Sequence, residues 1–201
     1  RTWYKMPNYR IGIMDYNAAK KANQFNCVIQ YEQHYMFTLD QDLKNIDYPF
    51  GGSPKNYSIR RIDVTKIIKC DTDYTEGYGF ISPFRGKANY YGTIYLGHRN
   101  NGNVVRIYNK TKELLDTDNG KKIELLSSYF GDIENLYTFE LELRRSHLKE
   151  NLGIETMADI PKIFEVYKNT LGSIRIYKDT DHNKKLIAQG NRKRIDAEIL
   201  T

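Results

Sequence analysis

Cysteine is scarce in this chain, and its scarcity excludes two classes of small protein. Cys27 and Cys70 are the only cysteines among 201 residues, and they lie far apart. Two such residues provide neither the disulfide framework of a small secreted domain nor the clustered ligands of a zinc site. We therefore expect two reduced thiols in a cytoplasmic protein.

Long apolar runs are also lacking, and the N-terminus has no secretory signal pattern. Internal repeats and low-complexity tracts are missing too. What is present suits a folded domain, since 40% of the residues are hydrophobic and 13% aromatic. The length of 201 residues allows one domain with a sizeable core. Because the chain starts at Arg1 without a methionine, we expect a fragment of a longer protein.

The charge balance favours a polyanionic partner. The formal net charge is +6, and Lys and Arg side chains neutralise phosphates and release counterions. Seventeen tyrosines add aromatic faces that can stack on unpaired bases, although tyrosine also packs well in sheets. On charge alone, a mildly basic surface without such a partner stays equally open.

The patterning predicts an α+β protein of several antiparallel strands and a few helices. Residues 1–178 form the expected main domain, and the charged residues 179–201 form a terminal helix or linker. We expect one or two strands within residues 25–39, at 27–31 and 35–39, and further strands at 57–68, in the two runs flanking Asn101-Gly102, at 137–145 and at 173–177. The expected helices are 110–115, 146–152 and 157–171.

The strongest pattern is a hairpin over residues 90–113. Asn101-Gly102 readily takes the positive φ angles that a tight turn requires. In the second strand Val105 points one way, while Arg106 and Tyr108 point the other. A guanidinium and a phenol thus share one polar face, where they can hold a phosphodiester beside a nucleophile.

Three predicted strands carry unusual polar residues opposite a hydrophobic face. These residues are Asp63, the pair Arg106 and Tyr108, and the pair Glu140 and Glu142. If the sheet stacks these faces on one side, carboxylate oxygens converge into a suitable site for Mg²⁺ or Mn²⁺. Such an ion polarises a phosphoryl oxygen during a displacement.

Plainer interpretations of the same residues stay open. A Glu-x-Glu segment is often the solvent face of a strand. Asp63 can pair with Arg60 or Arg61, and Tyr108 can be a packed sheet residue. A phenol with a pKa of about 10 is also a poor nucleophile, so it needs a nearby cation or base, such as Lys110 or a metal ion.

Three segments together are similar to the replication initiation factor family, the rolling-circle initiators and relaxases of plasmids, integrative elements and some filamentous phages. The hairpin segments Gly92–Arg99 and Val105–Glu113 carry most of the likeness. Ile59–Val64 resembles the Arg-x-Asp strand of the family, and Phe139–Arg145 resembles its Glu-containing strand.

The resemblance implies a central antiparallel sheet with helices on one face, and a metal-dependent endonuclease of the bacterial cytoplasm. The enzyme nicks one strand at an origin, stays on the 5′ end through a phosphotyrosine and frees a 3′-OH. The family nucleophile falls on Tyr108, and the acidic metal ligands fall on Asp63, Glu140 and Glu142. Where many members have Asp after the tyrosine, this chain has Asn109.

The expected partner is single-stranded or cruciform origin DNA, and the resemblance also implies a homodimer or a host helicase. We expect Arg106 and Lys110 to counter the phosphate charge. The expected DNA contacts are Arg61, Arg99, Lys112, Arg144 and Tyr95. Two alternatives remain, namely an origin-binding module that does not cut and a metal nuclease that uses water in place of Tyr108.

Overall fold

The computed structural model describes residues 2–5, 9–13, 15–21, 27–31, 53–195 and 197–199. The chain divides into two units, Arg1–Gly51 and Gly52–Thr201. In the first, β1 (Thr2–Lys5), β2 (Tyr9–Ile13) and β3 (Cys27–Tyr31) form an antiparallel sheet, and α1 spans Tyr16–Lys21. This confirms the strand predicted at 27–31, while the one predicted at 35–39 lies outside the described residues. The domain boundary predicted after residue 178 stays a prediction.

The second unit is built on a five-stranded antiparallel sheet with the strand order β4-β9-β8-β7-β6. This sheet, together with the helices around it, confirms the predicted α+β class. Its strands are β4 (Arg61–Lys69), β6 (Lys87–Tyr90), β7 (Thr93–Leu96), β8 (Asn103–Asn109) and β9 (Leu136–Arg144).

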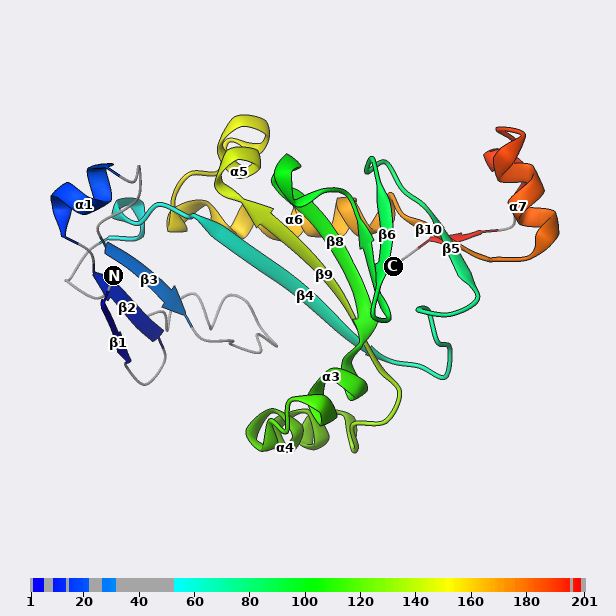
Figure 1. The fold of residues 1–201 in the computed structure, drawn as a ribbon, viewed down its shortest axis with the longest axis horizontal. Coiled ribbons are helices and arrows are strands. Elements are labelled where there is room, and N and C mark those ends of the chain that lie inside the picture. The colour runs from blue at the N-terminus through cyan, green and yellow to red at the C-terminus, as the bar shows by residue number, and fades with distance from the viewer. Residues whose placement is uncertain are drawn as a thin grey trace. The chain divides into compact units, whose positions relative to one another are not determined.

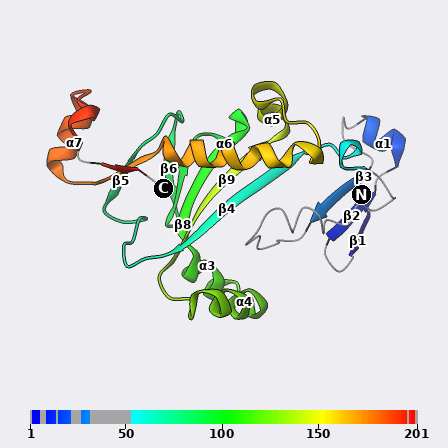
Figure 2. The same cartoon turned by 180° about the vertical axis from the view of Figure 1, so that it is seen from behind.

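Helix α6 (Ile160–Gly172) covers one face of this sheet. It lies behind the strands in Figure 1 and in front of them in Figure 2. Its buried stripe includes Ile163 and Leu171, and the Tyr167 hydroxyl donates a 2.8 Å hydrogen bond to the Phe139 carbonyl on β9. Because strand side chains alternate, the buried Phe139, Leu141 and Leu143 of β9 face α6, and Glu140 and Glu142 point to the opposite face.

The predicted hairpin is present as β7 and β8, but its turn differs from the expected one. Residues 97–102 make the connection, which includes the short helix η3 (Arg99–Asn101). Only Gly102 of the Asn-Gly pair has a positive φ, at 75°, so the tight two-residue turn predicted there is wrong. A Cβ on Gly102 would also lie 2.8 Å from Oγ of Ser146, which belongs to the helix after β9, so glycine allows that helix to approach closely.

The tight turn lies instead between β6 and β7. Tyr91 and Gly92 have φ angles of 49° and 75°, which is the paired positive-φ geometry of a hairpin turn. Tyr90 and Tyr91 therefore lie at the tip of a second hairpin. Their rings are arranged edge to face, with 4.6 Å between the ring centres.

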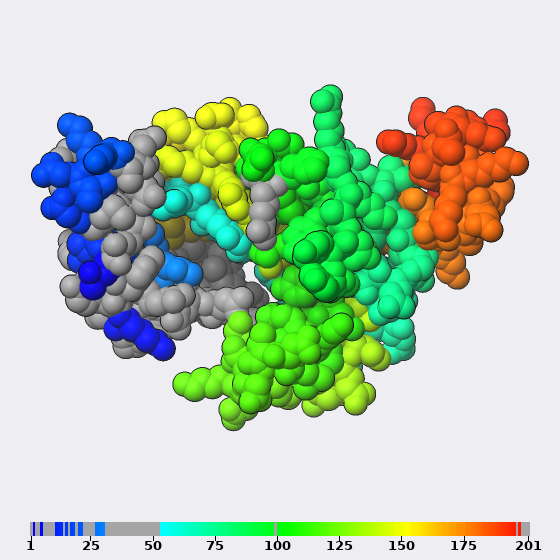
Figure 3. Space-filling view, in the orientation of Figure 1, coloured from blue at the N-terminus to red at the C-terminus, as the bar shows by residue number. Residues whose placement is uncertain are grey.

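Other helices and a small sheet surround the main sheet of this unit. Helices α3 (Lys110–Asp116) and α4 (Gly120–Phe130) lie below the strands in Figure 1, and the same green residues lie at the bottom of Figure 3. Helix α5 (Arg145–Leu152) follows β9 and is capped by Gly153. β5 (Tyr78–Ile81), β10 (Arg175–Lys178) and β11 (Glu198–Ile199) form a separate antiparallel sheet, and α7 spans Asp181–Ala188. No helix in the described part of the chain is long and apolar enough to cross a membrane.

Candidate active site

Strand pairing brings the predicted site residues onto one face of the sheet. Glu140 on β9 lies opposite Arg106 on β8, and Glu142 lies opposite Asp63 on β4. Residues directly opposite each other in an antiparallel pair point to the same face, and Tyr108 follows Arg106 by two positions on β8. All five side chains therefore lie on the face opposite α6, as the alternation of the sequence predicts.

Arg106 lies at the centre of the carboxylates. Its Nη2 pairs with Glu140 Oε1, and it lies 3.8 Å from Asp63 Oδ2 and 3.9 Å from Glu142 Oε2. The side chains of Arg106 and Glu142 are only 19% and 1% exposed, and buried charges are tolerated only when they are paired. The buried Nε of Arg106 has no hydrogen-bond partner among the described residues, so one donor of this guanidinium is not used by the described part of the chain.

Two further guanidiniums compensate the remaining negative charge. Arg144 Nε donates a 2.7 Å hydrogen bond to Glu142 Oε1, and Arg61 Nη2 lies 3.2 Å from Glu142 Oε2 and 2.7 Å from Asp63 Oδ2. Burial raises the pKa of Glu142, but the hydrogen bond from Arg144 and the charges of Arg61, Arg144 and Arg106 outweigh it. The pKa of Glu142 consequently lies below its ordinary value. Of the two partners considered for Asp63, Arg61 is the one it contacts.

Tyr108 lies at the edge of this charged cluster. Its hydroxyl donates a long hydrogen bond of 3.4 Å to Glu140 Oε2, and its ring is half-buried. The ammonium of Lys110 lies 5.8 Å from the centre of the same ring, a cation–π distance. The phenol is therefore outside the apolar core and next to both a carboxylate and a cation.

Lys110 itself is buried at the start of α3, with an exposed fraction of only 3%. It forms an ion pair of 2.7 Å with Glu113, three residues along the helix. Lys122 on α4 lies near this pair, and burial together with the charge of Lys110 lowers its pKa. The sequence analysis missed Glu113 and Lys122. The i, i+3 spacing of Lys110 and Glu113 on a predicted helix was the signal for the first.

Asn109, at the position where the family resemblance expects an aspartate, has a structural role here. Its Oδ1 accepts a 2.9 Å hydrogen bond from the backbone N–H of Lys112, which caps the N-terminus of α3. By strand alternation it also lies on the opposite face from Tyr108. An aspartate there would cap the helix in the same way and would not add a carboxylate to the cluster around Arg106.

The residues predicted to contact DNA are spread over three places. Arg61 and Arg144 lie on the face with Tyr108, and Tyr95 on β7 lies there too, opposite Arg106. Lys112 is exposed on α3. Arg99 belongs to η3, and its side chain lies outside what the structure describes. The main-sheet face thus gathers three of the five.

The three carboxylates supply the oxygen donors that Mg²⁺ and Mn²⁺ prefer, from adjacent strands. Within the described residues, however, no group of three His, Cys, Asp or Glu side chains is arranged to hold an ion. The reason is visible in the geometry, because the Nη2 of Arg106 lies within 3.9 Å of an oxygen from each of Asp63, Glu140 and Glu142. The three carboxylates have the right chemistry for a divalent cation, but in this arrangement they do not form a site, and a guanidinium holds the central position.

Comparison with models of protein families finds no match to this chain, and comparison with curated proteins finds none either. A functional proposal therefore rests on the side chains of this face and on the motifs that contain them.

Proposed function

We propose that the protein nicks one strand of DNA by transesterification, with Tyr108 as the nucleophile. The observation that carries this proposal is the position of the Tyr108 hydroxyl, 3.4 Å from Glu140 and on the same sheet face as Arg106. The resemblance of the hairpin motifs to the replication initiation factor family supports the same chemistry. Under this proposal the substrate is single-stranded or cruciform origin DNA in the bacterial cytoplasm, and a homodimer or a host helicase is an expected partner.

Each polar residue has a defined part in the proposed reaction. The phenolic oxygen of Tyr108 attacks phosphorus, the bond from phosphorus to the 3′ oxygen breaks, and a 5′-phosphotyrosine forms. Glu140 accepts the phenolic proton and returns it to the departing 3′ oxygen, so that atoms and charge balance. Arg106 and Lys110 stabilise the negative charge of the transition state.

A divalent cation is the proposed cofactor. Asp63, Glu140 and Glu142 would hold Mg²⁺ or Mn²⁺, which when bound polarises a phosphoryl oxygen. For these carboxylates to bind an ion, the side chain of Arg106 has to leave its place among them.

The test is formation of a covalent adduct between the protein and DNA. The probe is a 3′-end-labelled pool of single-stranded DNA hairpins with randomised loops, incubated with Mn²⁺ and analysed under denaturing conditions. We expect label to travel with the protein, and we expect Tyr108→Phe to abolish this adduct while DNA binding is retained. Tyr129→Phe is the matched control, because Tyr129 is exposed on α4 and has no proposed part in the chemistry or in DNA contact.

Each result has a clear meaning. An adduct that survives in Tyr108→Phe contradicts the assignment of the nucleophile. Cleavage without any adduct, equally strong in Tyr108→Phe, indicates a metal nuclease that uses water. Absence of cleavage in wild type, with the pool bound, rejects the enzyme and leaves a binding module.

The binding module is the second candidate, and one observation favours it. Each carboxylate of the cluster contacts at least one arginine. Holding the guanidiniums in place on the sheet is therefore a sufficient role for the acidic side chains. In that case Glu140→Gln weakens DNA binding through the displaced Arg106. In the nickase, Glu140→Gln abolishes cleavage and leaves binding intact.

A further inference from the structure

A pocket of about 440 Å³ lies beside β5 and β6, away from the cluster around Tyr108. Its size falls in the range of small-ligand sites, roughly 300–1,000 Å³. Leu96 of β7 forms part of its wall. By strand alternation Leu96 lies on the sheet face opposite Tyr95 and Arg106. The pocket is therefore separate from the proposed nicking site.

Every charged residue that lines this pocket is a cation. These residues are Arg85, Lys87 and Arg192, and all three side chains are exposed. Within the described part of the chain, none of them forms an ion pair. An acidic side chain near the pocket, Asp179, is 3.5 Å from Lys184 and thus already has a partner. The pocket has an uncompensated positive charge, which favours an anionic ligand.

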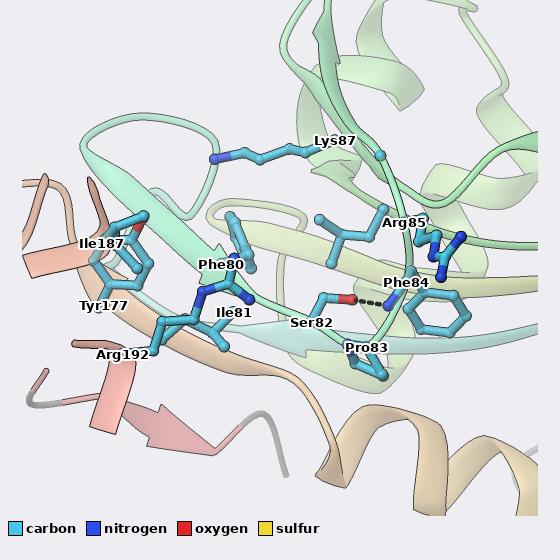
Figure 4. A pocket seen from close by; sticks show the side chains of 12 residues that line it. Phe80, Ile81, Ser82, Pro83, Phe84, Arg85, Lys87, Tyr177, Ile187 and Arg192 are labelled. Carbon is cyan, nitrogen blue, oxygen red and sulfur yellow. Dashed lines mark hydrogen bonds between the residues drawn. The ribbon is translucent and has the colours of Figure 1, made fainter. Parts of the chain in front are cut away.

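Aromatic rings make up much of the remaining wall. Phe80, Phe84 and Tyr177 line the pocket. Figure 4 shows Lys87 extending over Phe80 from one side and Arg192 reaching toward it from the other. The Lys87 ammonium lies 5.5 Å from the centre of the Phe80 ring, which places the charge beside an aromatic face.

A glycine on the neighbouring strand leaves the space that the ring of Tyr177 occupies. Tyr177 on β10 lies opposite Gly79 on β5, and a Cβ on Gly79 would collide with the Tyr177 ring. The ring therefore lies across β5 only because residue 79 has no side chain. Glycine weakens a strand, and it is often found where another group approaches closely. Here it lets one wall of the pocket be aromatic.

We infer that this pocket binds a nucleotide. The base packs against the half-buried ring of Tyr177, and the phosphate is bound by Arg192, Lys87 and Arg85. Stacking on an aromatic side chain contributes about 1–3 kcal/mol per base, and hydrogen bonds from cations to phosphate are the strong, charge-assisted kind. The nucleotide comes either from a bound DNA strand or from the free pool. The inference does not depend on Tyr108 chemistry.

Ligand-observed NMR and calorimetry with the full chain test this inference. The probes are deoxyadenosine monophosphate, deoxyadenosine, inorganic phosphate and a short single-stranded oligodeoxyadenylate. We expect the monophosphate to bind more tightly than either of its parts. Arg192→Gln and Lys87→Gln should each weaken its binding by about tenfold, the loss expected for one hydrogen bond to a charged group. Lys193→Gln is the matched control, because Lys193 is an exposed cation next to Arg192 that does not line the pocket.

A second variant tests the aromatic wall without changing any charge. Gly79→Ala should displace the Tyr177 ring and weaken binding of the monophosphate, while inorganic phosphate binds as before. Circular dichroism and the melting temperature establish that this variant is folded. If it is unfolded, Tyr177→Leu takes its place.

The outcomes separate the source of the nucleotide from failure of the inference. Binding of the oligonucleotide alone, sensitive to the pocket variants, identifies a nucleotide of a DNA strand as the ligand. Binding that the pocket variants leave unchanged, no binding at all, or binding of inorganic phosphate as tight as that of the monophosphate overturns the inference. The measurements are repeated with Tyr108→Phe, where pocket binding should persist. Failure of nicking and failure of nucleotide binding are thus observed independently.

Discussion

Replacing Arg106 with glutamine should destabilise the protein strongly, because this one guanidinium serves three carboxylates. Breaking a buried ion pair costs about 3–5 kcal/mol, and breaking an exposed one costs about 0–1 kcal/mol. The pair with Glu140 is near the buried limit, since the two side chains are 19% and 9% exposed. Allowing for that residual exposure, we expect Arg106→Gln to lower the free energy of unfolding by about 2–4 kcal/mol.

Thermal melting measures this loss. At roughly 2–4 °C per kcal/mol for a chain of this size, the melting temperature should fall by roughly 5–15 °C. Arg61→Gln is the matched control, because its side chain is 45% exposed and its loss should cost at most about 1 kcal/mol. Mn²⁺ should restore more stability to Arg106→Gln than to wild type, because the three carboxylates then lack their central cation. Equal melting temperatures for the two arginine variants would refute the central role of Arg106.

Three further perturbations test individual features of the structure. The pKa of Glu142 lies below its ordinary value of 4.5 in the folded protein. Its pairing therefore stabilises the fold above about pH 4.5 and is lost as the pH falls through the lower folded pKa, so urea unfolding of Glu142→Gln should depend less on pH in that window. Asn109→Ala removes the cap of α3 and should cost about 1 kcal/mol in chemical denaturation, whereas Asn109→Asp should cost little. Tyr91 is 89% exposed and has a φ of 49°, so Tyr91→Asn should stabilise the protein by up to about 1 kcal/mol, measured as a higher denaturation midpoint.

Much of the site could be predicted from the sequence because two-residue periodicity is a strong constraint. Alternation alone places Arg106 and Tyr108 on the same face of β8, and Glu140 and Glu142 on the same face of β9. The strand order that makes them neighbours is a tertiary property. It depends on β9 pairing with both β4 and β8, and no local pattern specifies this.

The failures of sequence reasoning occurred where tertiary contacts override local preference. Asn101 does not take a positive φ and instead belongs to η3, while Gly102 lies close to Ser146. Tyr91 does take one, although tyrosine is an unfavourable choice there. The strand β5 is only four residues long and follows a polar stretch, so its periodicity was too short to recognise. The partner of Lys110 was missed although its i, i+3 spacing on the predicted helix was a usable signal.

The balance of charges on the sheet face limits how the proposed reaction can begin. Three carboxylates and three guanidiniums form one network there, so this face has little net charge although the chain carries +6. A phosphodiester that approaches Arg106 must compete with Glu140 for the guanidinium. Once Arg106 turns to the phosphate, the carboxylate of Glu140 is released from that ion pair, and it already lies beside the Tyr108 hydroxyl. Under the proposed function, arrival of the phosphate would itself free the base that lies beside the nucleophile.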